Sequence, residues 1–228
     1  MPDICIIIPA LNEAQNIPLV LKDIPEKIGQ IIVVDNNSTD GTDKVAAELG
    51  ATVVYEPIQG YGQACLTGIK AAGECDILVF LDADYCDDPK LIPELIAPIL
   101  NGKADLVIGS RCIHKSAKTN LSPQQRWGNA LACILMRWFW RGQYTDLGPF
   151  RAISKTSLDR INMQDRNFGW TVEMQIRASK HQLQIKEIAV PYRLRQYGKS
   201  KISHTFKGVI GAGSKILFVI GRELFRSK

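Results

Sequence analysis

The sequence has no pair of cysteines at C-x-x-C spacing, although it contains six cysteines. Several of them lie inside apolar runs, so we expect neither a zinc site nor a disulfide framework, and a reduced, cytosolic location is favoured. The N-terminus lacks a basic segment followed by an apolar core, and we therefore expect no signal peptide. There is no internal repeat or low-complexity tract, and 228 residues are enough for one domain with a full core.

Acidic residues are scarce in the second half of the chain. Residues 1–100 contain 5 Lys or Arg against 16 Asp or Glu, whereas residues 101–228 contain 23 against 7. One interpretation is solvated charge scattered over the surface. The alternative is a basic half that meets anions, such as phosphates or an acidic membrane surface. Nucleic acid is not an expected partner, because no recognition motif for it is present.

Apolar runs alternate with helical patterns along the first half of the chain. Four β-branched runs without polar alternation predict strands buried on both faces, at 3–9, 30–35, 52–55 and 76–82. Helices are expected between them at 16–27, 40–49 and 62–72, which gives βαβ units. Further along we expect a helix at 89–100 broken by Pro93 and Pro98, strands at 105–108, 147–153 and 185–192, and helices at 122–140, 171–180 and 205–225. This order predicts an α/β fold, with a Rossmann-like, mostly parallel sheet covered by helices on both faces.

Polar residues follow three of the predicted strands. The strand ends read P-A-L-N-E at 9–13, D-N-N-S-T-D-G-T at 35–42 and D-A-D at 82–84. Ligands of open parallel sheets bind just beyond the carboxyl ends of the strands, so Asp35, Asp82 and Asp84 are expected to meet in one crevice. Each of them alone has a second interpretation, as a helix cap or a turn residue.

The D-A-D segment predicts a divalent cation site. Two carboxylates that flank one small residue at a strand end can bind Mg²⁺ or Mn²⁺ from one side, and a substrate phosphate can complete the coordination shell. The cation then neutralises the charge of a departing diphosphate.

These segments together resemble the family 2 glycosyltransferases of the GT-A fold. The likeness is greatest to the branch that transfers mannose or glucose to dolichyl phosphate or polyprenyl phosphate. It covers nearly the whole chain and rests on the three strand ends together with G-S-R at 109–111, F-R-A at 150–152 and Y-G-K-S-K at 197–201.

The resemblance implies a role for each matching residue. The donor nucleotide is expected to lie against Pro9, Ala10, Asn12, Glu13, Asp35 and Asn37. Asp82 faces the sugar and the metal, and Asp84 binds the metal. Arg111 and Arg151 are expected to bind phosphates or the acceptor. Arg195, Ser200 and Lys201 belong to a loop that closes over the donor and the acceptor phosphate.

Three positions leave alternatives open. Members of that branch often have Gln where this chain has Cys86, and a thiol is a poor Mg²⁺ ligand, so Asp87 is the candidate replacement. Glu173 is a candidate general base, a partner that orients arginines, or a carboxylate that complements the helix dipole. Gly60-Tyr61-Gly62 is either a phosphate-binding turn or a plain turn.

The expected reaction is metal-dependent, inverting transfer of a sugar from a nucleoside diphosphate sugar to an acceptor, polyprenyl phosphate being the first candidate. One alternative keeps the fold and changes the acceptor to a soluble or cell-envelope glycan or lipid. A nucleotidyltransferase is less favoured, because P-A-L-N-E stands where such enzymes usually have a Gly-rich, Arg-containing loop. A non-catalytic subunit that binds nucleotide sugars is disfavoured by the intact D-A-D and Y-G-K-S-K.

Residues 204–228 are expected to form a basic amphipathic helix beyond a glycosyltransferase domain of residues 1–203. At 100° per residue, Phe206, Val209, Ile210, Ile216, Leu217, Ile220 and Leu224 share one face, and Lys207, Lys215, Arg222 and Arg226 share the other. Only seven residues separate Lys207 from Lys215, whereas a spanning helix needs about 20 apolar residues. We expect the helix to lie on the cytoplasmic face of a membrane. The alternatives are a helix packed on its own domain with its basic residues in water, a membrane-protein partner, or a homo-oligomer.

Overall fold

The computed structural model describes residues 2–26, 28–113, 120–198 and 206–226, and in the last of these segments it describes side chains from Gly213 onward. Ser200 and Lys201 therefore lie outside the described residues. So do the side chains of Phe206, Val209 and Ile210, which were assigned to the apolar face of the last helix.

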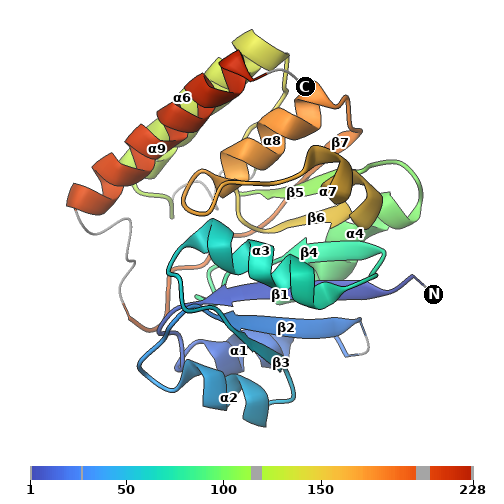
Figure 1. Cartoon of the computed structure of the whole chain (residues 1–228), viewed down its shortest axis with the longest axis vertical. Coiled ribbons are helices and arrows are strands. Elements are labelled where there is room, and N and C mark those ends of the chain that lie inside the picture. The colour runs from blue at the N-terminus through green and yellow to red at the C-terminus, as the bar shows by residue number, and fades with distance from the viewer. Residues whose placement is uncertain (1, 27, 114–119, 199–205, 227–228) are drawn as a thin grey trace.

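The core of the molecule is one seven-stranded sheet in the order β3-β2-β1-β4-β6-β5-β7 (Figure 1). The strands are β1 (Ile4–Ala10), β2 (Gln30–Asp35), β3 (Thr52–Tyr55), β4 (Ile77–Phe80), β5 (Leu106–Ser110), β6 (Arg151–Ser154) and β7 (Ile185–Ala189). Neighbouring strands pair in parallel except at β6, which is antiparallel to β4 and to β5. The predicted α/β fold with a mostly parallel sheet is confirmed.

Helices cover both faces of the sheet, as predicted. The helices are α1 (Ile17–Asp23), α2 (Thr42–Glu48), α3 (Tyr61–Ala72), α4 (Ile92–Leu100), α6 (Pro123–Trp140), α7 (Lys155–Ile161), α8 (Trp170–Lys180) and α9 (Phe206–Phe225). Alternate residues of β1 enter opposite cores: Ile7 packs with α3 and α8, and Ile6 packs with α1 and α4. A strand buried on both faces has no polar side to present, which explains the unbroken isoleucine run.

Three helix predictions need correction. α1 ends at Asp23 rather than at residue 27, because Ile24 precedes Pro25 and adopts an extended conformation. Pro98 does not break α4: it lies inside that helix, and the break instead falls before Ile92, where a 3₁₀ turn (Pro89–Leu91) precedes it. α7 was not predicted at all. Its N-terminus is marked by Ser154, whose hydroxyl accepts a hydrogen bond from the backbone N–H of Ser157.

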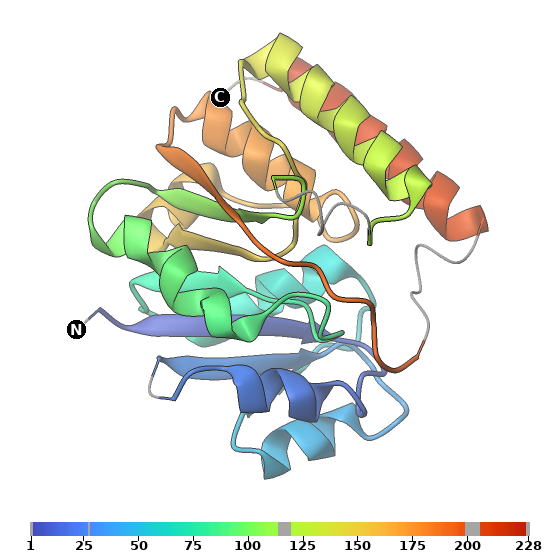
Figure 2. The same cartoon turned by 180° about the vertical axis from the view of Figure 1, so that it is seen from behind.

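Three strands are shorter than predicted, and each is shortened at the edge of the sheet where the site lies. β4 ends at Phe80 rather than at residue 82. β6 begins only at Arg151, because residues 147–150 form a loop instead of a strand. β7 ends at Ala189, and the chain then crosses the edge of the sheet toward α1 as an irregular segment (Figure 2).

α9 lies beside α6 and α8 in both views of the molecule (Figures 1 and 2). Val219 and Ile220 of α9 are buried in the core that α8 and α6 share. Its predicted faces are only partly right, because Leu217 and Leu224 are exposed whereas Ile216 and Ile220 are packed. Among the described residues, no helix is both long enough and apolar enough to cross a bilayer.

Candidate functional site

The loops after β1 and β2 are tied together at the carboxyl edge of the sheet. Asn12, in a left-handed conformation, donates from its backbone N–H to the Ser38 hydroxyl at 2.9 Å, and its side-chain oxygen accepts from the backbone N–H of Thr39 at 2.8 Å. Asp35 is buried at the end of β2, and one of its carboxylate oxygens, Oδ1, has no hydrogen-bond partner among the described residues. Such an unpaired buried oxygen is suited to a polar ligand group.

The other residues predicted to contact the nucleotide lie at the same edge. Pro9 and Ala10 are the last residues of β1, and Ala10 is buried. Asn37 is exposed and also left-handed, and its side-chain oxygen accepts from the Tyr55 hydroxyl at 3.0 Å. The structure thus brings the ends of β1 and β2 together, as the sequence predicted.

Asp82 follows β4 and is held by a residue that sequence reasoning did not assign. The Tyr61 hydroxyl, at the start of α3, donates to Asp82 Oδ1 at 2.9 Å. Burial and then the charge of Asp84 raise the pKa of Asp82 to about 7. Asp84 accepts from the backbone N–H of Cys86 at 3.0 Å, so D-A-D forms a turn in which the Asp84 carboxylate is close enough to disfavour ionisation of Asp82.

Asp87 is buried, and neither of its carboxylate oxygens has a hydrogen-bond partner in the part of the chain that the structure describes. Burial raises the pKa of Asp87 well above its ordinary value; the charge of Arg111 opposes that change, and those of Asp82 and Asp84 reinforce it. A buried carboxylate without a partner is costly unless a cation or a donor binds it. Cys86 is buried beside it, and burial raises the pKa of its thiol, which disfavours the thiolate form that binds metals.

Arg111 is held at the end of β5 by Asp146. Its Nε and Nη2 donate to the two carboxylate oxygens of Asp146 at 2.7 and 2.8 Å, and its guanidinium lies 5.0 Å from the centre of the Tyr192 ring. Burial raises the pKa of Asp146, but the charge of Arg111 outweighs it and the net pKa is lowered. Arg111 Nη1 has no partner among the described residues, so this side of the guanidinium can bind an anion.

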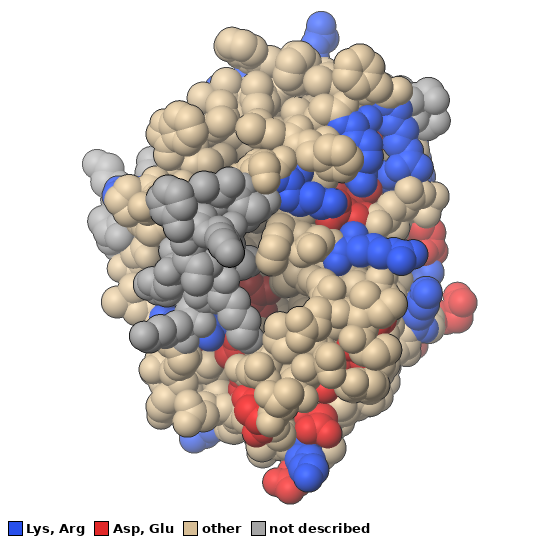
Figure 3. Space-filling view, turned by 60° about the vertical axis from the view of Figure 1, so that its left-hand side comes forward, with Lys and Arg blue, Asp and Glu red and all other residues tan. Residues whose placement is uncertain are grey.

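Arg195 reaches into the site from the segment after β7. Its Nη2 lies 2.5 Å from Glu13 Oε1 and 3.6 Å from Asp84 Oδ2. The Asn16 side chain also donates to the backbone carbonyl of Tyr197 at 3.2 Å, so the segment lies against the loop after β1. Figure 3 shows a hollow in one face of the molecule with acidic atoms in it.

Arg151 and Glu173 occupy different environments from those expected. Arg151 is fully buried at the start of β6, and its guanidinium donates to the carbonyls of Leu147, Gly148 and Thr171. Arg151 therefore holds the backbone beneath the site in place, and it has no exposed surface that a phosphate could contact.

Glu173 is also fully buried, and it is paired with Arg177 at 3.2 Å and Arg222 at 2.7 Å. Of the three interpretations of Glu173, this geometry supports the one in which its carboxylate orients arginine side chains. Its position in the first turn of α8 also suits the helix dipole.

No group of three His, Cys, Asp or Glu among the described residues is arranged closely enough to hold a metal by itself. Asp82, Asp84 and Asp87 nevertheless share one acidic neighbourhood beside Arg111. The signal that could have identified Tyr61 is its place as the first residue of α3, at the same sheet edge as the carboxylates.

Comparison with known proteins shows the family of the chain. The model of the glycosyl transferase family 2 matches residues 5–162. An uncharacterised glycosyltransferase of Mycobacterium tuberculosis is 35% identical over 91% of this chain and 93% of its own length. An undecaprenyl-phosphate mannosyltransferase of Micrococcus luteus is 28% identical over 90% of this chain and 88% of its own.

A solved structure has the same fold. Glucosyl-3-phosphoglycerate synthase from Mycobacterium tuberculosis, in complex with Mn²⁺, UDP and glucosyl-3-phosphoglycerate, superposes with a TM-score of 0.79 at 22% identity. The match covers 100% of this chain and 81% of that one. The α/β sheet with acidic strand ends is the architecture of a GT-A glycosyltransferase. The chain belongs to glycosyl transferase family 2, which confirms the family predicted from its motifs.

Proposed function

We propose that this glycosyltransferase moves a sugar from a nucleoside diphosphate sugar to polyprenyl phosphate, with Mg²⁺ or Mn²⁺ as cofactor. One observation supports the proposal most directly. Three carboxylates, those of Asp82, Asp84 and Asp87, lie at one edge of the sheet beside the guanidinium groups of Arg111 and Arg195. Carboxylates there suit a cation and a diphosphate, and the guanidinium groups suit a second phosphate.

The donor half of the site consists of the loops after β1, β2 and β4. Asp35, with its unpaired oxygen, binds the ribose or base, and Pro9, Ala10, Asn12, Glu13 and Asn37 surround the nucleotide. Asp82 and Asp84 would hold the metal, which neutralises the charge of the departing diphosphate. The carboxylates fit such a cation, because Asp82 has a raised pKa and Asp87 lacks a partner.

The acceptor half is centred on Arg111, which Asp146 holds through Nε and Nη2, so that Nη1, unpaired among the described residues, can bind a phosphate oxygen. An acceptor phosphate carries an ionised oxygen near neutral pH, so its attack on the anomeric carbon needs no strong base. The new bond joins that oxygen to the anomeric carbon while the bond to the diphosphate breaks and its electrons leave with the diphosphate. A single displacement of this kind inverts the configuration. Arg195, Ser200 and Lys201 are proposed to close over both phosphates.

An apolar pocket of about 560 Å³ between α6 and α9 supports a lipid acceptor. Trp127, Leu131, Ile216 and Leu217 are among the residues that line it. The pocket reaches the N-terminal end of α6. That end is close to Arg111, because Asn120, just before the helix, donates to the backbone carbonyl of Tyr192, and the Tyr192 ring lies against the Arg111 guanidinium. A polyprenyl chain can therefore lie in the pocket while its phosphate meets Arg111. The named activity of the Micrococcus relative supports the same acceptor class.

A panel of UDP- and GDP-sugars tests this function, with release of UDP or GDP as the readout. Each donor is paired with polyprenyl phosphate or with 3-phosphoglycerate, which appears in the structural neighbour, and radiolabelled product is partitioned into organic solvent. We expect labelled product in the organic phase. Product only in water would replace the lipid acceptor with a soluble one, pyrophosphate release would indicate a nucleotidyltransferase, and no turnover would indicate a binding subunit.

The residue that assists the metal is tested at Cys86 and Asp87. We expect Cys86→Gln to keep turnover within about threefold of wild type and Asp87→Asn to weaken Mn²⁺ binding by about tenfold. Asp87→Asn should also raise the melting temperature of the metal-free protein, because it removes a buried carboxylate without a partner. Calorimetric titration with Mn²⁺ and thermal melts measure both effects. Loss of metal affinity in Cys86→Gln with normal affinity in Asp87→Asn would reverse the assignment.

We also propose that the protein works on the cytoplasmic face of a membrane, through the exposed side of α6 and α9. Trp127 and Trp138 on α6 are 73% and 75% exposed, and Phe225 on α9 is 93% exposed. α6 contains no acidic residue, and the only acid of α9, Glu223, is buried in ion pairs. Lys215 and Arg222 are paired with buried acids and do not face lipid, so the contact relies on aromatic residues and on the exposed Arg126 and Arg137.

Sedimentation with vesicles that contain an anionic phospholipid tests this surface. Trp127→Ser combined with Trp138→Ser should reduce vesicle binding by about tenfold or more at low salt, because two large apolar side chains no longer leave water. Leu49→Ser, at the C-terminal end of α2, is the matched control and should bind normally, because Leu49 is exposed and α2 lies at the opposite end of the molecule from α6 and α9 in Figure 1. Equal binding of the double variant and wild type, or no binding of wild type, would contradict a membrane contact. A chain that ends at Ser203 is a poor test, because it removes Arg222 from the buried Glu173.

A further inference from the structure

Tyr61 is the one described side chain that hydrogen-bonds to Asp82. Its ring packs against the core beneath the site, and burial raises the pKa of its hydroxyl well above the ordinary value, so the hydroxyl stays protonated and donates. One hydrogen bond to Oδ1 limits rotation of the carboxylate and leaves Oδ2 available. This is the arrangement by which a neighbouring residue orients a metal ligand.

The first turn of α3, which carries Tyr61, is held by the backbone of residues 165 and 166. The backbone N–H of Gln63 donates to the carbonyl of Arg166 at 2.9 Å. A Cβ on Gly60 would overlap that same carbonyl, and a Cβ on Gly62 would overlap the carbonyl of Asp165. The two glycines of Gly60-Tyr61-Gly62 are therefore required for close contact with this backbone, and the phosphate-binding alternative for this turn is not needed to explain them.

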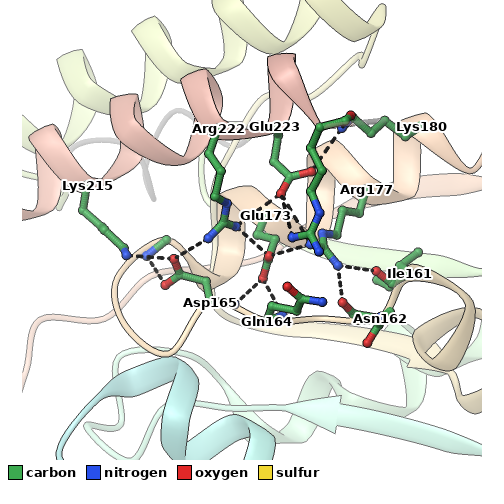
Figure 4. A network of polar contacts seen from close by, with 12 residues as sticks. Ile161, Asn162, Gln164, Asp165, Glu173, Arg177, Lys180, Lys215, Arg222 and Glu223 are labelled. Carbon is green, nitrogen blue, oxygen red and sulfur yellow. Dashed lines mark hydrogen bonds and ion pairs between the residues drawn. The ribbon is translucent and has the colours of Figure 1, made fainter. Parts of the chain in front are cut away.

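Residues 164–169 are in turn held by buried carboxylates (Figure 4). Asp165 accepts with Oδ1 from the backbone N–H groups of Asn167 and Gly169, which closes the segment on itself. Glu173 accepts with Oε2 from the backbone N–H groups of Gln164 and Asp165 at 2.9 and 2.6 Å. Both carboxylates are buried, so the segment is stable only while each has a cationic partner.

The partner of Asp165 comes from α9, and Glu173 has one partner on α9 besides Arg177 of its own helix. Lys215 Nζ lies 3.1 Å from Asp165 Oδ2, and Arg222 Nη2 lies 2.7 Å from Glu173 Oε1 (Figure 4). Gly169 also lies against α9, where a Cβ would overlap the Val219 side chain. α9 thus contacts the segment that supports α3, and α3 carries the hydroxyl that reaches Asp82.

We propose that Tyr61 is a positioning residue for Asp82, and that α9 sets its position through the buried carboxylates of Asp165 and Glu173. The proposal rests on the proposed function, in which Asp82 binds the cation. It gives the C-terminal helix a second role besides any contact with a membrane: undocking of α9 weakens the cation site from a distance.

Two variants test the chain of contacts by Mn²⁺ titration of the full-length protein in the presence of UDP. Tyr61→Phe keeps the ring and removes only the hydroxyl, and we expect Mn²⁺ affinity to fall by about tenfold. Arg222→Met removes the charge opposite Glu173 and should lower affinity in the same direction, by roughly threefold or more. Both should lower kcat more at limiting Mn²⁺ than at saturating Mn²⁺, which a purely structural role would not produce.

Two control variants separate positioning from loss of stability. Arg226→Met changes an exposed cation directly after the same helix, whose distance to Glu223 is 4.0 Å, and should leave Mn²⁺ affinity unchanged. Tyr144→Phe removes another buried hydroxyl, which donates to the carbonyl of Gln175, and should lower the melting temperature without changing the affinity. If Arg222→Met does not fold, Lys215→Met replaces it, because Lys215 is the more exposed of the two cations.

The titrations also test the cation site separately from the positioning role of Tyr61 and its coupling to α9. If Asp82→Asn binds Mn²⁺ as well as wild type does, the proposed cation site is wrong. If Asp82→Asn binds weakly while Tyr61→Phe binds normally, the cation site stands and the positioning role of Tyr61 is overturned. If Tyr61→Phe binds weakly while Arg222→Met, or Lys215→Met in its place, binds normally, the coupling to α9 is overturned.

Discussion

Asp84→Ala should lower kcat by about 10³-fold or more, equivalent to roughly 4 kcal/mol of transition-state stabilisation. Asp84 lies in the turn after β4, beside Asp82 and 3.6 Å from the guanidinium of Arg195. Without its carboxylate the cation loses a ligand, and the departing diphosphate loses the charge that neutralises it. Steady-state turnover with the best donor of the panel measures the effect.

Asp84→Asn and Asp43→Ala serve as comparisons. The Asn variant retains a side-chain oxygen for the backbone N–H of Cys86, so it keeps the turn and should still lose most activity. Asp43 is an exposed carboxylate in the first turn of α2, and its removal should change turnover by less than about twofold. Wild-type activity should disappear in excess EDTA and return with Mn²⁺ or Mg²⁺. Full activity of Asp84→Ala in EDTA would disprove the metal-dependent reaction.

Asp146→Asn should lower the free energy of unfolding by about 3 to 5 kcal/mol, because it leaves the Arg111 guanidinium without its charged partner in a buried site. For a chain of this size the melting temperature should fall by roughly 10 °C. Asp159→Asn is the matched control: that carboxylate pairs with Lys155 on the surface of α7, and its loss should cost no more than about 0.5 kcal/mol. Urea unfolding of the two variants measures both values.

A double variant separates stability from chemistry. Arg111→Met with Asp146→Leu replaces the ion pair by apolar side chains and should recover much of the lost stability, but it should not recover transfer to a phosphate acceptor. Normal turnover of the double variant would show that Arg111 does not bind the acceptor.

The same pair sets a pH dependence. The pKa of Asp146 is lowered below its ordinary value of 3.8, so its stabilising contribution is present above about pH 4 and is lost as the pH falls through the lowered pKa. The difference in unfolding free energy between wild type and Asp146→Asn should therefore shrink below about pH 4. A constant difference down to pH 2 would contradict the assignment.

Features that depend on residues close together in the sequence were predicted well. Strands β2 and β3 have the predicted bounds, and Pro9, Asp35 and Asp82 meet at the carboxyl edge of the sheet. Unbroken β-branched runs can only be buried strands, and parallel strands bring their carboxyl ends to one edge. Helix α7 was missed because its seven residues are too few to show an amphipathic period.

The roles of single charged side chains were predicted less well. Arg151 was expected at a phosphate and is instead buried among backbone carbonyls, because β6 enters the sheet antiparallel between β4 and β5. Lys215 and Arg222 were expected to face water or lipid and are instead paired with Asp165 and Glu173. Nothing in the sequence around either partner indicates the other.

The sequence by itself determined the α/β class, the glycosyltransferase family and the edge at which the carboxylates gather. All three follow from local periodicity and from the order of short motifs along the chain. Only the tertiary structure decided that Tyr61 reaches Asp82, that Asp146 holds Arg111, and that α9 neutralises the acids beneath α3. Buried charges select their partners by proximity in three dimensions, and an ion pair between residues about 50 positions apart leaves no periodic trace in the chain.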